Sequence, residues 1–356
     1  MIKMRIAALV TLTLSLSGCA AQQSTTEYEA SPKPLELAFG KMLPTPFAPE
    51  LSSAFDSPWP TDVSRLELVN TALYKSFEYF DSIKKSNCQL SPKIFGGDPM
   101  PPDHVKVLED IVQQMTSVFC NYLSDEFYVI GGNYKFIKKT IRSENIPGDY
   151  EKGCGQNGKI PFSACAFAQI ASITNIGDTR KGQTFIEDRK LTIAAHEVFH
   201  VIHDQIDPDP GGQIPPRGQE FFRPVWFIEG GGEFFGRLMP YYFGLIDHYG
   251  TFAPSTRYGE PVQKALLGDL EFLEIRRQVA DGTENYYAGQ IALEYITASL
   301  GMEALLDIWV RMGDGQSFDS AFESVTGLDT KKFYAKFKTL HDNLYAGDVV
   351  TNELSN

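Results

Sequence analysis

Hydrophobic positions in the first part of the chain recur at helical spacing. A first helix is expected within Asp62–Ser86, where the apolar side chains that recur about one turn apart are Leu66, Leu68, Val69, Leu73, Phe77 and Phe80. Glycines and prolines between 96 and 102 then interrupt the pattern. A second helix is predicted from His104 to Leu123, where the apolar spacing resumes.

Short runs of β-branched and aromatic residues follow the second predicted helix. They predict strands at Phe127–Ile130, Tyr134–Ile141 and Ala164–Thr174. From Asp188 onward, helical spacing dominates. A small mixed sheet followed by a mainly helical half predicts an α+β fold, with a functional site where the two parts meet.

The N-terminus has the pattern of a secretory signal. Lys3 and Arg5 precede an apolar stretch, Ile6–Leu16, which is too short to span a bilayer but is typical of a signal-peptide core. The residues that follow resemble the bacterial lipobox: Leu16-Ser17-Gly18-Cys19. This resemblance implies cleavage before Cys19 and attachment of lipid to it. An ordinary secretory signal with an incidental cysteine is the alternative.

The chain is expected to consist of several parts with different roles. The expected parts are a signal peptide at 1–18, the lipidated cysteine and a polar tether at 19–33, a helical extension at 34–104 and a tail at 346–356. Between the extension and the tail, a main domain is expected at 105–345, the stretch covered by the family resemblance that is described below. Ala20 follows the cysteine, and by resemblance to the sorting rule of Gram-negative lipoproteins it indicates the outer membrane. We expect a monomer that reaches the membrane through its lipid.

The net charge of the chain argues against some classes of binding partner. The formal net charge is −13, and no basic cluster interrupts the acidic composition. A nucleic acid partner is therefore not expected, because binding its phosphates needs a basic surface. An acidic surface also gains nothing from anionic lipid, so acyl chains would have to supply the membrane anchor.

The cysteines predict disulfides. If Cys19 is lipidated, the others form an even set in a compartment that permits oxidation: Cys88, Cys120, Cys154 and Cys165. Among the possible pairings we favour Cys88 with Cys120, which would join neighbouring helices, and Cys154 with Cys165, which would close a short loop. A zinc site made of these cysteines lacks the usual C-x-x-C spacing.

The segment Ala195–Asp204 contains the pattern H-E-x-x-H in an apolar run without Gly or Pro. On a helix, His196 and His200 project from one face, one turn apart, and can share one Zn²⁺ ion. Glu197 can reach a metal-activated water and take its proton. His203 lies about one further turn along the helix, too far to bind the same metal ion. It is expected either at the surface or in contact with a ligand residue. The alternative is a core helix whose two histidines are only hydrogen-bonded.

A second segment contains a candidate for a third ligand. Trp226-Phe227-Ile228-Glu229-Gly230, with Glu233 one turn on, resembles the second zinc helix of the gluzincin peptidases, the clan of thermolysin and aminopeptidase N. The resemblance implies that Glu229 binds zinc and that Glu233 orients a ligating histidine. Gly230–Gly232 would let two helices approach closely, although a glycine-rich loop with solvated glutamates is the alternative. The interval before Glu229 is longer than in those peptidases and predicts a loop.

A third segment resembles the same clan. Tyr286-Tyr287-Ala288-Gly289 is similar to the turn in which aminopeptidases place a tyrosine that stabilises the oxyanion. Alignment on the glycine favours Tyr286 as this tyrosine, with Tyr287 as the alternative. If neither residue has a catalytic role, both are aromatic side chains of the core or its rim. Together, the resemblances imply a zincin-like fold with the H-E-x-x-H helix at the cleft, and a zinc peptidase acting on a peptide or protein. A noncatalytic metal-binding or scaffold lipoprotein is one alternative, and a zinc hydrolase that acts on a bond other than a peptide bond is another.

Overall fold

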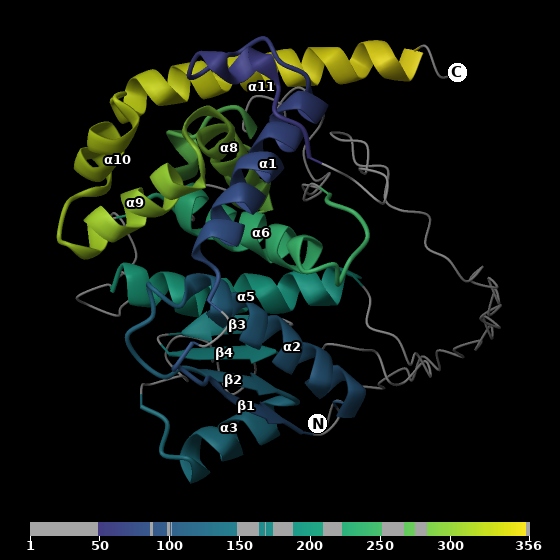
Figure 1. Ribbon diagram of the computed structural model, residues 1–356, viewed down its shortest axis with the longest axis vertical. Helices are drawn as coiled ribbons and strands as arrows, with labels where there is room; N and C mark the ends of the chain where they lie inside the picture. The colour runs from purple at the N-terminus through teal and green to yellow at the C-terminus, as the bar shows by residue number, and fades with distance from the viewer. Residues whose placement is uncertain are drawn as a thin grey trace, which may run out of the picture. The chain divides into compact units, whose positions relative to one another are not determined.

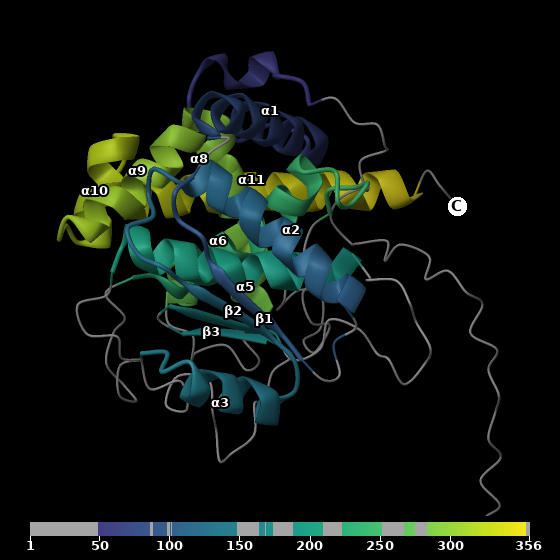
Figure 2. The same cartoon turned by 60° about the horizontal axis from the view of Figure 1, so that its bottom comes forward.

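The small sheet has helices on both faces: α5 lies directly on one face, and α3 lies on the other (Figures 1 and 2). The computed structural model describes residues 49–85, 88–97, 100, 102–147, 164–167, 169–173, 188–208, 223–250, 267–274 and 283–353. The described elements are η1 (Ser53–Asp56), α1 (Arg65–Ile83), β1 (Lys93–Gly96), α2 (Pro102–Phe119), β2 (Tyr128–Gly131), α3 (Tyr134–Ser143), β3 (Ala164–Phe167), β4 (Ile170–Ile173), α5 (Asp188–Ile206), α6 (Val225–Tyr242), η3 (Phe272–Glu274), α8 (Thr283–Leu300), α9 (Met302–Gly313), α10 (Phe318–Thr326) and α11 (Thr330–Glu353).

The sheet is mixed. Its strand order is β1-β2-β4-β3, with β2 parallel to both β1 and β4, and β3 antiparallel to β4. Val129 pairs with Ala171 in the middle of the sheet, and both side chains are fully buried. The predicted α+β class is confirmed as a mainly helical chain with a small mixed sheet.

The strand predicted at Tyr134–Ile141 is wrong, because this segment forms the helix α3. The side chain of Asn133 accepts a hydrogen bond from the backbone N–H of Phe136 at 2.9 Å and so caps the helix. Ile137 is buried, and it lies three residues after Tyr134 and four before Ile141. That spacing is helical, and the aromatic and β-branched composition was misleading.

One further strand prediction needs correction, and one strand was not predicted. The single strand expected at Ala164–Thr174 is two strands, β3 and β4, and Thr174 lies outside the described residues. No Gly, Pro, Asn or Asp marks a turn between 164 and 174, so the sequence carries no turn signal. The strand β1 was not predicted, because its four residues are defined by long-range pairing with β2.

The helix predictions agree better with the structure. The first helix begins after Ser64, whose side chain accepts a hydrogen bond from the backbone N–H of Glu67 at 3.2 Å, while the Glu67 carboxylate accepts one from Ser64 N–H at 2.9 Å. Ser317 and Asp329 cap the starts of α10 and α11, and Gly327 ends α10 with a φ of 70°. Helix-capping signals involve residues only a few positions apart, so the ends of these helices can be recognised in the sequence.

The N-terminal segment packs against α8. Arg65 forms a buried ion pair with Glu294, and Lys75 Nζ donates a hydrogen bond to the carbonyl of Ala298 at 2.6 Å. The Trp59 ring meets Tyr295 edge-on, with ring centroids 5.3 Å apart. Residues before 105 therefore complete the helical core.

The predicted disulfide between Cys88 and Cys120 is present. Cys165 lies on β3, and its proposed partner Cys154 lies outside the described residues, so that pairing stays a prediction. The signal peptide, Cys19 and the tether also lie outside them, whereas α11 continues into the predicted tail, as far as Glu353. Among the helices described, none has the length and apolar composition to cross a membrane.

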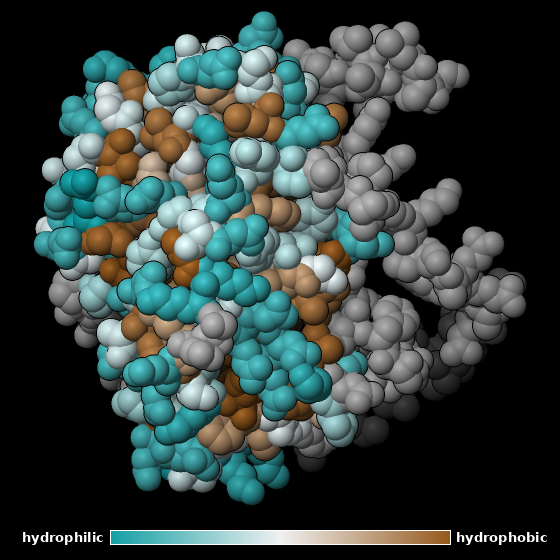
Figure 3. Space-filling view, in the orientation of Figure 1, coloured by the Kyte–Doolittle hydropathy of each residue, from teal (hydrophilic) through white to brown (hydrophobic). Residues whose placement is uncertain are grey.

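The face shown in Figure 3 is a mosaic of polar and apolar residues. Among the described residues, the large hydrophobic side chains that are exposed are Leu51, Leu66 and Tyr74. Most buried apolar side chains instead form one core, to which α5 and α6 both contribute.

Candidate metal centre

Glycines let α5 and α6 approach closely. A Cβ on Gly232 would lie 2.6 Å from His196 Cε1 and 2.8 Å from His200 Nε2. One turn later, a Cβ on Gly236 would lie 2.8 Å from the carbonyl oxygen of Thr192. The glycine run is therefore part of a buried helix, and the alternative of a solvated loop is wrong.

A second glycine contact joins α6 to α8. A Cβ on Gly230 would lie 2.4 Å from Gly289 Cα, and a Cβ on Gly289 would lie 2.1 Å from the carbonyl oxygen of Trp226. No side chain separates the two backbones at this point. Residues one turn from Gly289 on α8 are thereby brought to the histidines of α5.

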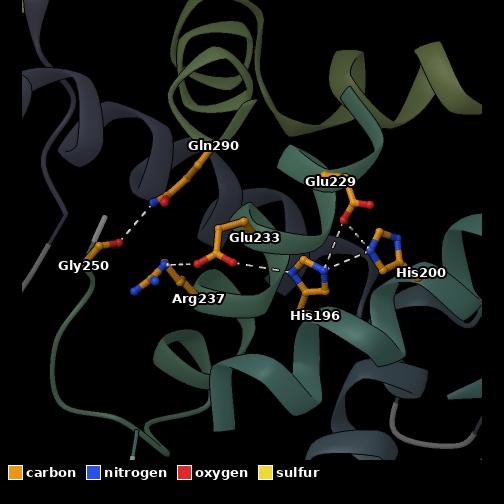
Figure 4. Close-up of polar contacts among 7 residues, drawn as sticks. All are labelled: His196, His200, Glu229, Glu233, Arg237, Gly250 and Gln290. Carbon is orange, nitrogen blue, oxygen red and sulfur yellow. Dashed lines mark hydrogen bonds and ion pairs between the residues drawn. The ribbon is translucent and has the colours of Figure 1, made fainter. Parts of the chain in front are cut away.

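His196, His200 and Glu229 converge on one point (Figure 4). The two imidazole Nε2 atoms lie 3.0 Å apart, and Glu229 Oε2 lies 3.8 Å from His196 Nε2 and 3.6 Å from His200 Nε2. Tetrahedral zinc, with bonds of about 2.0–2.2 Å, separates its ligand atoms by roughly 3.3–3.6 Å. The three separations span this value, so the donors fit one zinc ion with a fourth position left for water.

Within the part of the chain that the structure describes, this is the one group of three His, Cys, Asp or Glu residues whose ligand atoms lie within 4.8 Å of one another. Two neutral imidazoles and a carboxylate are a common donor set for catalytic zinc. The sequence prediction and the geometry therefore select the same three residues.

Glu233 contacts His196 on the side of the ring away from the other two candidate ligands. Its Oε2 is 3.5 Å from His196 Nδ1, and its Oε1 accepts a hydrogen bond from Arg237 Nε at 2.6 Å. Burial favours the neutral acid, but Arg237 and His196 outweigh it and lower the pKa of Glu233 to about 2. Glu233 is thus a carboxylate at neutral pH, suited to hold the Nδ1–H of His196.

His196 itself lies among carboxylates. Burial disfavours its protonated ring, but Glu229 and Glu233 outweigh burial and raise the pKa of His196 to about 10. A proton and a metal ion therefore compete for Nε2. A site that attracts a proton so strongly also has the negative charge to attract a divalent cation.

Glu197 faces the sheet side of α5. It is partly buried, and burial raises its pKa, with His196 and His200 opposing the shift. The backbone of Ala166 also donates a hydrogen bond that stabilises the Glu197 carboxylate. Ala166 belongs to β3, the edge strand of the described sheet. This carboxylate therefore lies between the histidine helix and the sheet edge.

The structure separates the two tyrosine candidates. The Tyr286 ring centroid lies 5.6 Å from that of His196, and this side chain is partly exposed. Tyr287 is 1% exposed, and its ring lies 6.2 Å from that of His341 on α11. Tyr286 is therefore the tyrosine beside the candidate ligands, and Tyr287 belongs to the core.

His203 lies apart from the three candidate ligands. It is buried, not at the surface, and its ring stacks with Phe199 at 6.3 Å and meets Trp309 edge-on at 5.5 Å. Burial lowers the pKa of His203 well below its usual value, so it is neutral. Its role is packing between α5 and α9.

Two arginines near these helices were missed from sequence. Arg223 donates from Nη2 to both Oδ1 and the carbonyl of Asp207, each at 2.7 Å, and so joins the end of α5 to the residues before α6. Residues 209–222 of the long interval lie outside the described residues. Arg237 could have been found, because it follows Glu233 by four residues on a predicted helix. The Arg223 contact has no such local signal.

No family model, curated protein or solved structure matches this chain. An assignment of function therefore depends on the geometry of His196, His200 and Glu229, together with the sequence patterns that first selected them.

Proposed function

We propose that this protein is a zinc-dependent hydrolase, and specifically a peptidase of the gluzincin type with a zincin-like fold. The observation that carries the proposal is the convergence of His196, His200 and Glu229 at separations that suit one tetrahedral zinc ion. A structural zinc site would close the fourth position with another protein ligand. Within the described residues no fourth His, Cys, Asp or Glu joins the three.

Zinc bound by these ligands would polarise a water molecule and the scissile carbonyl. Glu197, adjacent to His196 on α5, would accept the proton of the attacking water and deliver it to the leaving amine. The Tyr286 hydroxyl would donate a hydrogen bond to the developing oxyanion, supported by its ring contact with His196. Glu233 would hold the His196 imidazole in the orientation that presents Nε2.

The edge strand β3 supports a peptide as the substrate. It pairs with β4 on one side only among the described strands, and its Ala166 contacts Glu197. An extended peptide could add to this edge through backbone hydrogen bonds, and its scissile bond would then lie near the base. Backbone pairing of this kind accepts many sequences, with selectivity supplied by side-chain pockets.

We also propose that the protein is anchored in the cell envelope through lipid on Cys19. The support is the resemblance of Leu16-Ser17-Gly18-Cys19 to the lipobox. Metabolic labelling with a tagged fatty acid should mark the wild-type chain and leave the Cys19→Ser variant unlabelled. Labelling of that variant would contradict the proposal.

Elemental analysis of the purified protein tests the metal site. We expect one zinc per chain, lost in His200→Ala and in Glu229→Ala, because each variant leaves only two ligands. Glu197→Gln should keep its zinc but lose hydrolysis of a peptide library. If the wild type neither retains zinc nor regains it on addition, the hydrolase proposal fails; full activity of Glu197→Gln would remove the assigned base.

A further inference from the structure

Arg237 extends the line of polar residues that begins at the metal ligand on α6. Glu229, Glu233 and Arg237 follow one another at intervals of four residues, so they share one face of that helix (Figure 4). The Arg237 side chain is 19% exposed. Its Nε donates to Glu233 Oε1, while the other oxygen, Oε2, faces His196 Nδ1. The two oxygens of the Glu233 carboxylate therefore have different partners, Arg237 for one and His196 for the other.

We propose that Arg237 is a positioning residue for the metal centre: it fixes the Glu233 carboxylate so that Oε2 holds His196 in the metal-binding orientation. This inference rests on the proposed zinc site. A Glu side chain has several rotatable bonds, and a hydrogen bond to a histidine alone leaves its rotamer open. The Arg237 contact, at 2.6 Å, removes that freedom with a charge-assisted hydrogen bond.

The charges at the site point to the same role. With zinc bound and Glu197 ionised, the carboxylates of Glu197, Glu229 and Glu233 would exceed the charge of the metal by one. The Arg237 guanidinium restores neutrality without taking a ligand position. In a buried site an uncompensated charge is costly, so the Glu233 carboxylate needs this partner. An arginine suits the position because it stays charged.

Zinc affinity, measured by competition with a chelator, tests this role. In Arg237→Gln we expect affinity about tenfold weaker than in the wild type, as is typical when a partner of a ligating histidine is lost. Arg237→Lys keeps the charge and should recover most of the affinity. Arg311→Gln is the matched control, because Arg311 Nε donates to Asp307 four residues earlier at 2.8 Å, on α9. This control should bind zinc like the wild type.

A double-mutant cycle shows whether Arg237 acts through Glu233. In the Glu233→Gln background, adding Arg237→Gln should cause no further loss of zinc affinity. A full additional loss, or wild-type affinity in Arg237→Gln with reduced thermal stability only, would overturn the inference. Failure of the proposed function looks different, because the wild type would then bind no zinc or would bind it independently of His200.

Discussion

The helix α8 is held differently on its two sides. Toward α6, Gly289 and Gly230 bring the backbones together with no side chain between them. Toward the N-terminal segment, the contacts are made by long side chains, of which Arg65 and Lys75 reach Glu294 and a helix carbonyl. The contact between α8 and α6 leaves no room for an added atom. The contact between α8 and the N-terminal segment depends instead on particular charged side chains. Position is thus set by shape near the candidate metal centre and by electrostatics away from it.

The largest effect is expected from Gly289→Ala. The added Cβ would lie 2.1 Å from the backbone oxygen of Trp226, which cannot move without separating α6 from α8. We expect a loss of more than about 3 kcal/mol in the free energy of unfolding, measured by chemical denaturation. Gly231→Ala is the control, because its Cβ would meet only side-chain atoms of Trp309 and Phe199, at 3.1 and 3.3 Å. Equal losses in both variants would contradict the backbone contact.

The charged side of α8 is tested by Arg65→Met. Removing the arginine leaves the fully buried Glu294 with only Tyr249 and Gln290 as hydrogen-bond donors among the described contacts. We expect about 3 kcal/mol of destabilisation in thermal or chemical unfolding. The double variant Arg65→Met/Glu294→Gln should recover part of it, because no unpaired carboxylate remains buried. No recovery would show that packing, not charge, holds this side.

Tyr286→Phe probes the end of α8 at the candidate metal centre. Loss of its hydroxyl should lower kcat about 100-fold with zinc content unchanged, as for removal of an oxyanion donor. Tyr287→Phe is the matched control and should keep its kcat, since Tyr287 lies against His341 in the core. Steady-state kinetics on one peptide substrate compares them. A larger loss for Tyr287→Phe would reverse the assignment.

The smallest effect is expected from Gly232→Ala. Its Cβ would meet imidazole atoms of His196 and His200, which can shift, unlike the backbone at Gly289. We expect zinc affinity about tenfold weaker, which is about 1.4 kcal/mol, with little change in unfolding free energy, because alanine favours the helix by about 1 kcal/mol. Chelator competition and denaturation on the same sample separate the two quantities. Wild-type affinity would show that the histidines adjust freely.

The sequence predicted those parts of the site that lie on single helices. His196 and His200 share a helical face by spacing alone, and Glu229 and Glu233 do so on the next helix. Contacts between distant segments were predictable only where a motif or a cysteine count marked them, as for the disulfide between Cys88 and Cys120. Arg65 meets Glu294 across 229 positions, and no local pattern marks either as a partner of the other. The strand β1 was missed for the same reason, since its pairing with β2 defines it.

The hydrogen bonds from Arg223 to Asp207 have a consequence for how this protein can change. They tie together the two ends of the interval between the histidine helix and the Glu229 helix. The entropic cost of closing a loop grows only slowly with its length. Insertions, deletions or grafted sequences between 208 and 223 should therefore leave the metal-binding geometry intact. That interval is a natural place for evolution, or a protein engineer, to alter what the protein recognises without rebuilding the candidate metal centre.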